Sequence, residues 1–275
     1  MKHRLALVTG ATSGIGEALC FLFAQKGLSL LITGRDRHRL DALVQQLSPQ
    51  IVLQAIEADL STSNGRQKVM ALIHEYGPDL VINNAGFGLY GEALTYPTEE
   101  QEMMIEVNVT AVTELTLEAA RTLISDGKEG IVFNVSSAAA FQVIPNMAIY
   151  AASKAFVNQF SQGLDDEVKK YGVRILTICP GMVKTSFSKR AGQTQREKKV
   201  GVMSADFVAR EIWKQVQNLK PLTIIDWKYR FLTRLSAWLP SWTTAIIKKN
   251  IAERIAPRNL IKRESCIKKN LKKNR

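Results

Sequence analysis

The sequence LALVTGATSGIG (residues 5–16) decides the fold. Its first five residues are typical of a buried strand, and the glycine-rich turn that follows leads into apolar residues at helical spacing. Gly10 and Gly14 let the backbone turn and approach a ligand closely, and Gly16 lets the helix pack on the strand. Because free N–H groups at a helix start bind phosphate, this stretch predicts a pyrophosphate site. The alternative is a plain tight turn.

Six further apolar runs of strand length follow this stretch and alternate with helical patterns. They span residues 28–33, 51–56, 79–82, 131–135, 173–178 and 221–225. Continuous apolar strands that alternate with helices are typical of a parallel sheet with helices on both faces. We therefore expect a Rossmann-type, doubly wound α/β domain of about seven parallel strands over residues 1–226. A helical C-terminal extension over residues 227–275 follows it.

Polar residues and glycines cluster directly after the predicted strands. They are Asp59-Leu60, Asn83-Asn84-Ala85-Gly86, Ser136-Ser137 and Pro180-Gly181. The carboxyl ends of parallel strands form one edge of an open sheet, and ligands bind at that edge. We therefore expect these residues to line one site.

The residues after the second strand bear on the choice of dinucleotide. Gly34 stands where an acid that binds the ribose 2′-hydroxyl is expected, and Arg35 follows it. A guanidinium pairs with a 2′-phosphate, so this pattern favours NADP over NAD. Asp36 weighs on the other side, because it is acidic. Asp36 can also act simply as a helix N-cap between solvated arginines.

Tyr150 and Lys154 are four residues apart in a helical pattern, so they lie on one face of the helix. A phenol is a poor acid–base catalyst at neutral pH, and a fixed neighbouring cation favours the phenolate and lowers its pKa. This pair predicts proton transfer at the sheet edge.

Together these residues resemble the classical short-chain dehydrogenase/reductase family over residues 4–226. The resemblance is carried by the motifs Thr9-Gly10-x3-Gly14-Ile15-Gly16, Asp59, Asn83-Asn84-Ala85-Gly86, Asn108, Ser137, Tyr150-x3-Lys154 and Pro180-Gly181-x3-Thr185. It implies an NADP-dependent oxidoreductase that interconverts a carbonyl and a secondary alcohol, acting as a dimer through the helices that carry Asn108 and Tyr150.

The resemblance also implies roles for individual residues. Tyr150 would be the acid–base, Lys154 would lower its pKa and bind the nicotinamide ribose, Ser137 would polarise the carbonyl, and Asn108 would hold a water of a proton relay. The implied cofactor-binding residues are Gly10, Thr12, Ser13, Gly14, Ile15, Gly16, Arg35, Asp59, Leu60, Asn84, Ala85, Gly86, Asn108, Tyr150, Lys154, Pro180, Gly181, Val183 and Thr185.

Several alternatives stay open. Ser137 could only cap a turn, with Ser136 mistaken for it, and Asn108 could be a helix-kink residue without a proton role. The whole chain could be a nucleotide-binding regulatory or scaffold protein without turnover. An intact set of Ser137, Tyr150 and Lys154 argues against that last alternative, because a binding module needs no proton chemistry.

The segment after Pro180 predicts a mobile lid over an apolar ligand. The expected apolar wall consists of Met182 and Phe187 together with Leu89, Tyr90, Phe141, Val143 and Ile144, whereas Met103, Met104 and Met147 are expected either in the core or in this wall. This composition points to a lipophilic carbonyl or alcohol, and the family resemblance implies a substrate of 3-oxoacyl or steroid type.

The net positive charge of the chain comes entirely from its C-terminal tail. Residues 228–275 hold 14 Lys and Arg against 2 Asp and Glu, whereas the preceding residues hold 23 of each. Aromatic residues and a helical stripe of Ile246, Ile247, Ile251 and Ile255 accompany the charge, which is typical of a helix on an anionic membrane surface. Packing of the stripe on the domain is an equal alternative. Nucleic acid is not expected as a partner, because no reading module accompanies the charge.

Three scattered cysteines, Cys20, Cys179 and Cys266, indicate a reduced intracellular protein. Their spacing forms no metal-binding pattern, so no metal is expected. No apolar run is long enough for a membrane span or a secretory signal. We expect a cytoplasmic location with peripheral membrane contact as an addition.

Overall fold

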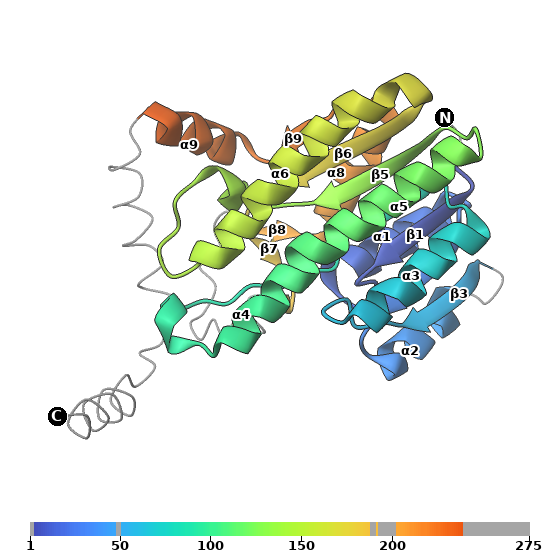
Figure 1. The fold of residues 1–275 in the computed structure, drawn as a ribbon, viewed down its shortest axis with the longest axis horizontal. Coiled ribbons are helices and arrows are strands. Elements are labelled where there is room, and N and C mark those ends of the chain that lie inside the picture. Colours follow the sequence, from blue (N-terminus) through green and yellow to red (C-terminus); the bar gives the residue numbers. More distant parts are fainter. Residues whose placement is uncertain (1–2, 48–50, 188–190, 192–201, 239–275) are drawn as a thin grey trace.

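The computed structural model describes residues 3–47, 51–187, 191 and 202–238. In this part of the chain a seven-stranded sheet, with the order β3-β2-β1-β4-β5-β6-β9, runs through the centre of the molecule (Figure 1). All six pairs of neighbouring strands are parallel. The strands are β1 (Leu5–Thr9), β2 (Ser29–Gly34), β3 (Val52–Glu57), β4 (Leu80–Asn83), β5 (Gly130–Val135), β6 (Val173–Cys179) and β9 (Leu222–Ile224). The predicted doubly wound sheet of seven parallel strands is therefore confirmed.

Helices cover both faces of the sheet. One face carries α1 (Gly14–Gln25), α2 (Arg37–Leu47) and α8 (Ala205–Asn218), and the other carries α3 (Ser63–Tyr76), α5 (Ala111–Ser125) and α6 (Ala148–Val168). Side chains of β1 alternate between the two layers, because successive residues of a strand point to opposite faces. Ala6 and Val8 belong to the first core cluster, and Leu7 belongs to the second. The core is thus split in two by the sheet.

Short elements complete the edge at which the strands end. They are η1 (Ala93–Thr95), α4 (Thr98–Ile105), the π-helical turn η2 (Glu106–Thr110) and η3 (Ala138–Phe141), whereas η4 (Lys169–Tyr171) lies at the opposite edge, directly before β6. A two-stranded sheet of β7 (Val183–Lys184) and β8 (Met203–Ser204), which the sequence did not predict, also lies at the edge where the strands end. Ser204 accepts a hydrogen bond from the Phe207 N–H at 3.1 Å and caps α8.

A buried hydrogen-bond network ties the middle strands to the helices above them. Asn83 at the end of β4 donates to Asn134 Oδ1 of β5 at 2.8 Å and to Thr116 Oγ1 of α5 at 3.0 Å. Asn134 in turn donates to Ser161 Oγ of α6 at 2.9 Å. Polar groups without partners are costly inside a protein, so this network favours one relative placement of β4, β5, α5 and α6.

The C-terminal extension begins with a helix, α9 (Trp227–Trp238). Asp226 precedes it in the left-handed backbone region, with a φ of 71°, and its carboxylate accepts the Lys228 N–H at 2.9 Å. The predicted isoleucine stripe and the last basic run fall outside the described residues. None of the described helices is both long and apolar enough to cross a membrane.

Candidate active site

A cavity of about 840 Å³ lies at the edge where the strands end, and the residues after β1, β2, β3, β4, β5 and β6 line it. Most of the predicted site residues are brought together there. They are Gly10, Thr12, Ser13, Gly14, Ile15, Arg35, Asp59, Leu60, Asn84, Ala85, Gly86, Ser137, Tyr150, Lys154, Pro180, Gly181, Val183 and Thr185. Gly16 and Asn108 do not line the cavity. Such an edge is where open parallel sheets hold their ligands.

The glycine-rich turn has the geometry of a phosphate cradle. Gly10 and Gly14 have φ angles of 64° and 62°, a region that side chains rarely adopt. A Cβ at Gly14 would lie 2.8 Å from Thr185 Cγ2, so the turn and the loop after β6 approach each other closely. The turn leads into the N-terminus of α1, whose free N–H groups favour an anion. The residues present therefore fit the pyrophosphate of a dinucleotide.

Gly16 lies behind this turn and contributes by its small size. A Cβ there would lie 2.3 Å from the Gly10 carbonyl oxygen, which is closer than atoms can approach. Its place thus agrees with the expected packing of the helix on the strand and not with direct contact to a ligand.

At the end of β2, Thr12 leaves little space beside Gly34, and two of the arginines that follow in the sequence line the cavity. A Cβ at Gly34 would lie 2.6 Å from Thr12 Cγ2, so an acidic side chain does not fit at this position. Arg35 and Arg39 both line the cavity, and Arg39 was not predicted from the sequence. Asp36 is paired with Arg39 at 3.3 Å and accepts the Arg39 N–H at 3.1 Å, so it caps α2 as one interpretation expected. This pairing offsets part of its negative charge.

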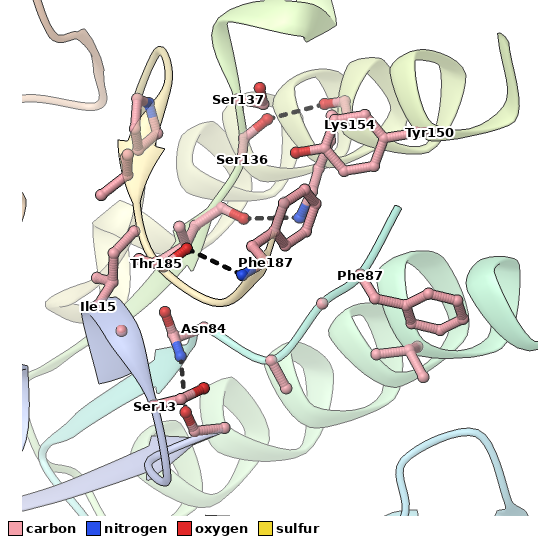
Figure 2. A pocket seen from close by; sticks show the side chains of 18 of the residues that line it. Ser13, Ile15, Asn84, Phe87, Ser136, Ser137, Tyr150, Lys154, Thr185 and Phe187 are labelled. Carbon is pink, nitrogen blue, oxygen red and sulfur yellow. Dashed lines mark hydrogen bonds between the residues drawn. The ribbon is translucent and has the colours of Figure 1, made fainter. Parts of the chain in front are cut away.

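Two other predicted cofactor residues make hydrogen bonds that shape the site. The Asn84 amide donates to the carbonyl oxygens of Thr9 at 2.9 Å and Gly10 at 3.2 Å, which joins the loop after β4 to the glycine-rich turn (Figure 2). Asp59 Oδ1 accepts the N–H and the hydroxyl of Ser61 at 3.0 and 2.8 Å. Both residues therefore fix the backbone of the cavity as well as lining it.

Ser137 and Tyr150 form a pair of hydroxyl groups in the cavity. The first residue follows β5 and the second lies in the first turn of α6, and the Ser137 hydroxyl interacts with that of Tyr150. Ser137 also caps η3 by accepting the Ala139 N–H at 3.1 Å. Ser136 instead donates to the Lys154 carbonyl oxygen at 3.0 Å. The geometry therefore distinguishes the two serines, and it is Ser137 that faces Tyr150.

Lys154 lies one helical turn after Tyr150 and is almost completely buried. Its Nζ donates to the Val135 carbonyl oxygen at 2.9 Å and lies 6.0 Å from the centre of the Tyr150 ring. Burial lowers the pKa of Lys154 to about 8. An ammonium with that pKa stands close to gaining or losing its proton at neutral pH.

The expected lowering of the tyrosine pKa by Lys154 is not what the structure shows. Burial raises the pKa of Tyr150 to about 12, and the hydrogen bond with Ser137 acts in the opposite direction without outweighing burial. The physical reason is that removal from water penalises the phenolate more than one hydroxyl donor stabilises it. In this cavity Tyr150 therefore stays a phenol at neutral pH.

Asn108 is fully buried in the π-helical turn η2, behind the cavity. Its amide donates to the Phe87 carbonyl oxygen at 2.9 Å and to Ser153 Oγ at 3.1 Å, and its Oδ1 accepts the Phe87 N–H at 3.2 Å. These bonds hold the loop after β4. The turn also matches the interpretation of Asn108 as a kink residue, and its relay role stays a prediction.

The far end of the cavity has an apolar wall. Tyr90, Ile144, Met147, Met182 and Phe187 of the predicted wall line it, and Phe187 packs on Tyr150 with a distance of 5.7 Å between the ring centres. Leu89, Phe141 and Val143 were expected in this wall and do not line the cavity. Phe87, Ala139, Gln142 and Tyr229 line it without having been predicted. Most of the predicted lid lies outside the described residues.

No group of three or more His, Cys, Asp or Glu side chains that could hold a metal ion occurs within the described part of the chain. The chemistry of the described cavity instead rests on hydroxyl groups, one ammonium and a phosphate cradle.

This combination of a doubly wound sheet, a phosphate cradle and a Ser–Tyr–Lys set defines a nucleotide-binding α/β protein with groups for proton transfer. The family model for short chain dehydrogenases matches residues 4–196, so the chain belongs to the short-chain dehydrogenase/reductase family. The protein is thus an oxidoreductase of this family, whose members bind NAD or NADP and commonly form oligomers.

Individual relatives agree with the family. An uncharacterized oxidoreductase from Staphylococcus aureus (strain USA300) is 34% identical over 200 residues, which are 72% of this chain and 86% of the relative. A short-chain dehydrogenase from Sphingobium yanoikuyae in complex with NADPH is 30% identical, with a TM-score of 0.77 over 86% of this chain and 94% of its own. The bulky-bulky ketone specific alcohol dehydrogenase from Comamonas testosteroni is 27% identical, with a TM-score of 0.74 over 87% and 94% of the two chains.

Proposed function

We propose that the protein is an NADPH-dependent reductase that interconverts a lipophilic ketone and its secondary alcohol. The observation that carries the proposal is the pair of hydroxyl groups of Ser137 and Tyr150 in the cavity, with Lys154 one turn further along α6. Hydride addition to a carbonyl builds negative charge on its oxygen, and two hydroxyl groups directed at one point stabilise that charge. NADPH, when bound, would supply the hydride.

The pKa values support a proton path in the direction of reduction. Tyr150 keeps its proton at neutral pH and can donate it to the developing alkoxide, whereas Lys154 has a pKa close to neutral and can return a proton to Tyr150. We propose that Ser137 orients the substrate oxygen by donating a hydrogen bond to it. The roles of Tyr150 and Ser137 are those implied by the family resemblance, whereas the role of Lys154 differs from the expected lowering of the Tyr150 pKa.

Three features support NADPH as the cofactor. Gly34 has no room for a side chain that would bind the 2′-hydroxyl, and Arg35 and Arg39 border the cavity next to it. Guanidinium groups suit a 2′-phosphate. The Sphingobium yanoikuyae relative, whose structure contains NADPH, fits this proposal. NAD is the less favoured cofactor.

The apolar wall supports a lipophilic ketone. Ile144, Met147 and Phe187 leave an apolar surface beside Tyr150, and this surface suits steroid-like or 3-oxoacyl substrates. The Comamonas testosteroni relative is named for bulky ketones, which agrees with a wide apolar cavity. A non-catalytic nucleotide-binding protein would have no use for the Ser137–Tyr150 pair.

The test is Tyr150→Phe with NADPH and a panel of ketosteroids, 3-oxoacyl thioesters, retinoids and small ketones. We expect kcat to fall about a hundredfold or more, because a general acid contributes that much, while the Kd of NADPH stays unchanged. Tyr171→Phe, at an exposed tyrosine of η4, is the matched control. Turnover by Tyr150→Phe at the parent rate would show that the catalytic assignment is wrong.

We further propose a cytoplasmic homodimer formed through η2, α5 and α6, whose C-terminal extension touches anionic membrane. Two exposed surfaces support this proposal. Phe156 of α6 is 40% exposed and stacks on Phe160, and Phe231 and Trp238 of α9 are 63% and 85% exposed.

A further inference from the structure

Tyr229 of α9 reaches back from the C-terminal extension into the cavity. Its ring lies where a side chain of Gly181 would be, because a Cβ at Gly181 would lie 2.0 Å from Tyr229 Cε2. Its hydroxyl accepts the Met182 N–H at 3.4 Å. Tyr229, Gly181 and Met182 all line the cavity. The helix α9 of the C-terminal extension therefore supplies part of the cavity wall.

The docking of α9 is fixed at several points. The Arg230 guanidinium donates to the Ile224 carbonyl oxygen of β9 at 2.7 Å, and Asp226 holds the first turn through the Lys228 N–H. Thr233, one turn after Tyr229, is also buried. The helix packs against η3, the turn that follows Ser137 directly. These contacts hold α9 on the domain and therefore fix the position of Tyr229.

The two loops that Tyr229 touches or borders carry the expected chemistry. One is Pro180–Val183 after β6, which the family resemblance assigns to the nicotinamide, and the other is η3 beside Ser137. Tyr229 contacts the first loop, and the helix that carries it packs on the second, so α9 connects the cofactor loop with the substrate wall. In addition, Tyr229 forms part of the cavity wall on the side of α9, so a substrate that extends toward α9 meets its ring.

We propose that Tyr229 is a positioning and specificity residue, which holds Gly181 and Met182 in place and sets the size limit for the ketone. The proposal rests on the proposed reductase function. It makes the first helix of the extension part of the active site, a role that the sequence did not suggest. The substrate class that follows is a ketone whose second substituent ends at η3, with bulkier ketones excluded by the ring.

A size exchange between Gly181 and Tyr229 tests the positioning role. Gly181→Ala alone should weaken NADPH binding on the order of tenfold, because its Cβ and the Tyr229 ring compete for one space. In the Tyr229→Ala background the same Gly181→Ala change should cost little. Protein fluorescence quenching by NADPH measures the Kd without turnover. If Gly181→Ala weakened NADPH binding equally in the parent and in the Tyr229→Ala background, the positioning role would be wrong.

Substrate size tests the specificity role. Tyr229→Ala should raise KM for small ketones and lower KM for bulky ketones, with the melting temperature within the range of the control. Phe231→Ala, an exposed residue on the opposite side of α9, is the matched control and should leave KM unchanged. Tyr229→Phe keeps the ring and should keep the size preference. An unchanged KM ratio in Tyr229→Ala would overturn the specificity role.

The two proposals fail in different ways. If the parent protein reduces ketones and Tyr150→Phe does not, while the Tyr229 variants match the parent, the function stands and the role of Tyr229 is wrong. If the parent reduces no ketone in the panel, the proposed function is wrong, and the NADPH measurements on Gly181 and Tyr229 still decide the positioning role.

Discussion

Arg35 follows the last residue of β2 and borders the cavity on the side where the adenosine ribose is expected. At the scale of single residues it is the side chain on which the cofactor preference depends. Gly34 explains why no acid stands there, since Thr12 occupies the space. Arg39 adds a second guanidinium from α2.

Arg35→Ala should weaken NADPH binding about tenfold or more and change NADH binding little. A hydrogen-bonded guanidinium–phosphate pair contributes about 1.5–3 kcal/mol, and NADH has no 2′-phosphate. Fluorescence titration with both nucleotides gives the two Kd values. Arg37→Ala is the matched control, because Arg37 pairs with Asp41 at 2.9 Å and does not line the cavity. Equal losses for both nucleotides would refute the role of Arg35.

Lys154 should leave a signature in the pH dependence of stability. The unfolded chain keeps this ammonium protonated up to about pH 10.5, whereas the folded protein releases the proton near pH 8. Between these values the folded state binds fewer protons, so its stability rises with pH. Urea denaturation from pH 7 to pH 10 should show the parent gaining stability relative to Lys154→Met as pH rises. A constant difference between the two would contradict the lowered pKa.

Residue patterns predicted the site contacts unevenly. The glycine-rich turn, Ser137 and Tyr150 could be predicted, because their chemistry depends on spacing within one element or one strand end. The pKa of Tyr150 could not, since burial comes from side chains such as Phe187 that lie far away in the sequence. Arg39 was not predicted as a cavity residue. Whether its side chain lines the cavity together with Arg35 depends on where α2 begins.

At the scale of elements, α9 carries two different faces. Residues of a helix are 100° apart, so Tyr229 and Thr233 lie on one face and Phe231, Leu235 and Trp238 on the opposite one. The first face is docked on the domain, and Phe231 and Trp238 of the second are strongly exposed. The inner face of α9 packs on the domain, as one interpretation of the extension expected. For the outer face, contact with lipid stays a proposal.

The outer face should bind anionic vesicles. Replacing Phe231 and Trp238 together by Glu should lower vesicle binding strongly, because it removes the aromatic contacts and adds repulsion. Deleting residues 239–275 removes 11 of the 14 basic residues and should also lower binding, whereas it spares Tyr229. Cosedimentation with anionic and with neutral vesicles measures both effects. Unchanged binding in both variants would leave intramolecular packing as the explanation of the extension.

Helices and strands could be predicted where both the spacing of the apolar residues and the length of the segment indicated the same kind of element. The seven strands of the sheet were found because each is a mainly apolar run of strand length between turn residues. The pair β7 and β8 was missed, since each has two residues and forms only because Val183 meets Met203 across the chain. The π-helical turn η2 was foreseen only as a kink at Asn108, because its hydrogen-bond pattern has no residue signature.

At the scale of the whole molecule, we expect two copies to pair through α5 and α6. Phe156 and Phe160 stack at 5.6 Å with nearly parallel rings, and Phe156 is partly open to solvent. Phe156→Glu should shift the protein toward monomer, since a charge in an apolar interface costs several kcal/mol. Light scattering after size exclusion measures the mass. Leu53→Glu, at an exposed apolar residue of β3, is the control, and an unchanged mass of Phe156→Glu would contradict this interface.

The place of β1 in the sheet has a consequence for biogenesis. This strand pairs with β2 on one side and with β4, some seventy residues later, on the other, so Ala6 meets Leu80. A chain emerging from the ribosome therefore cannot complete the surroundings of the glycine-rich turn until β4 has been synthesised. Contacts over such long separations form slowly, so the nascent half-domain exposes the flank of β1 and needs protection from aggregation until β4 arrives.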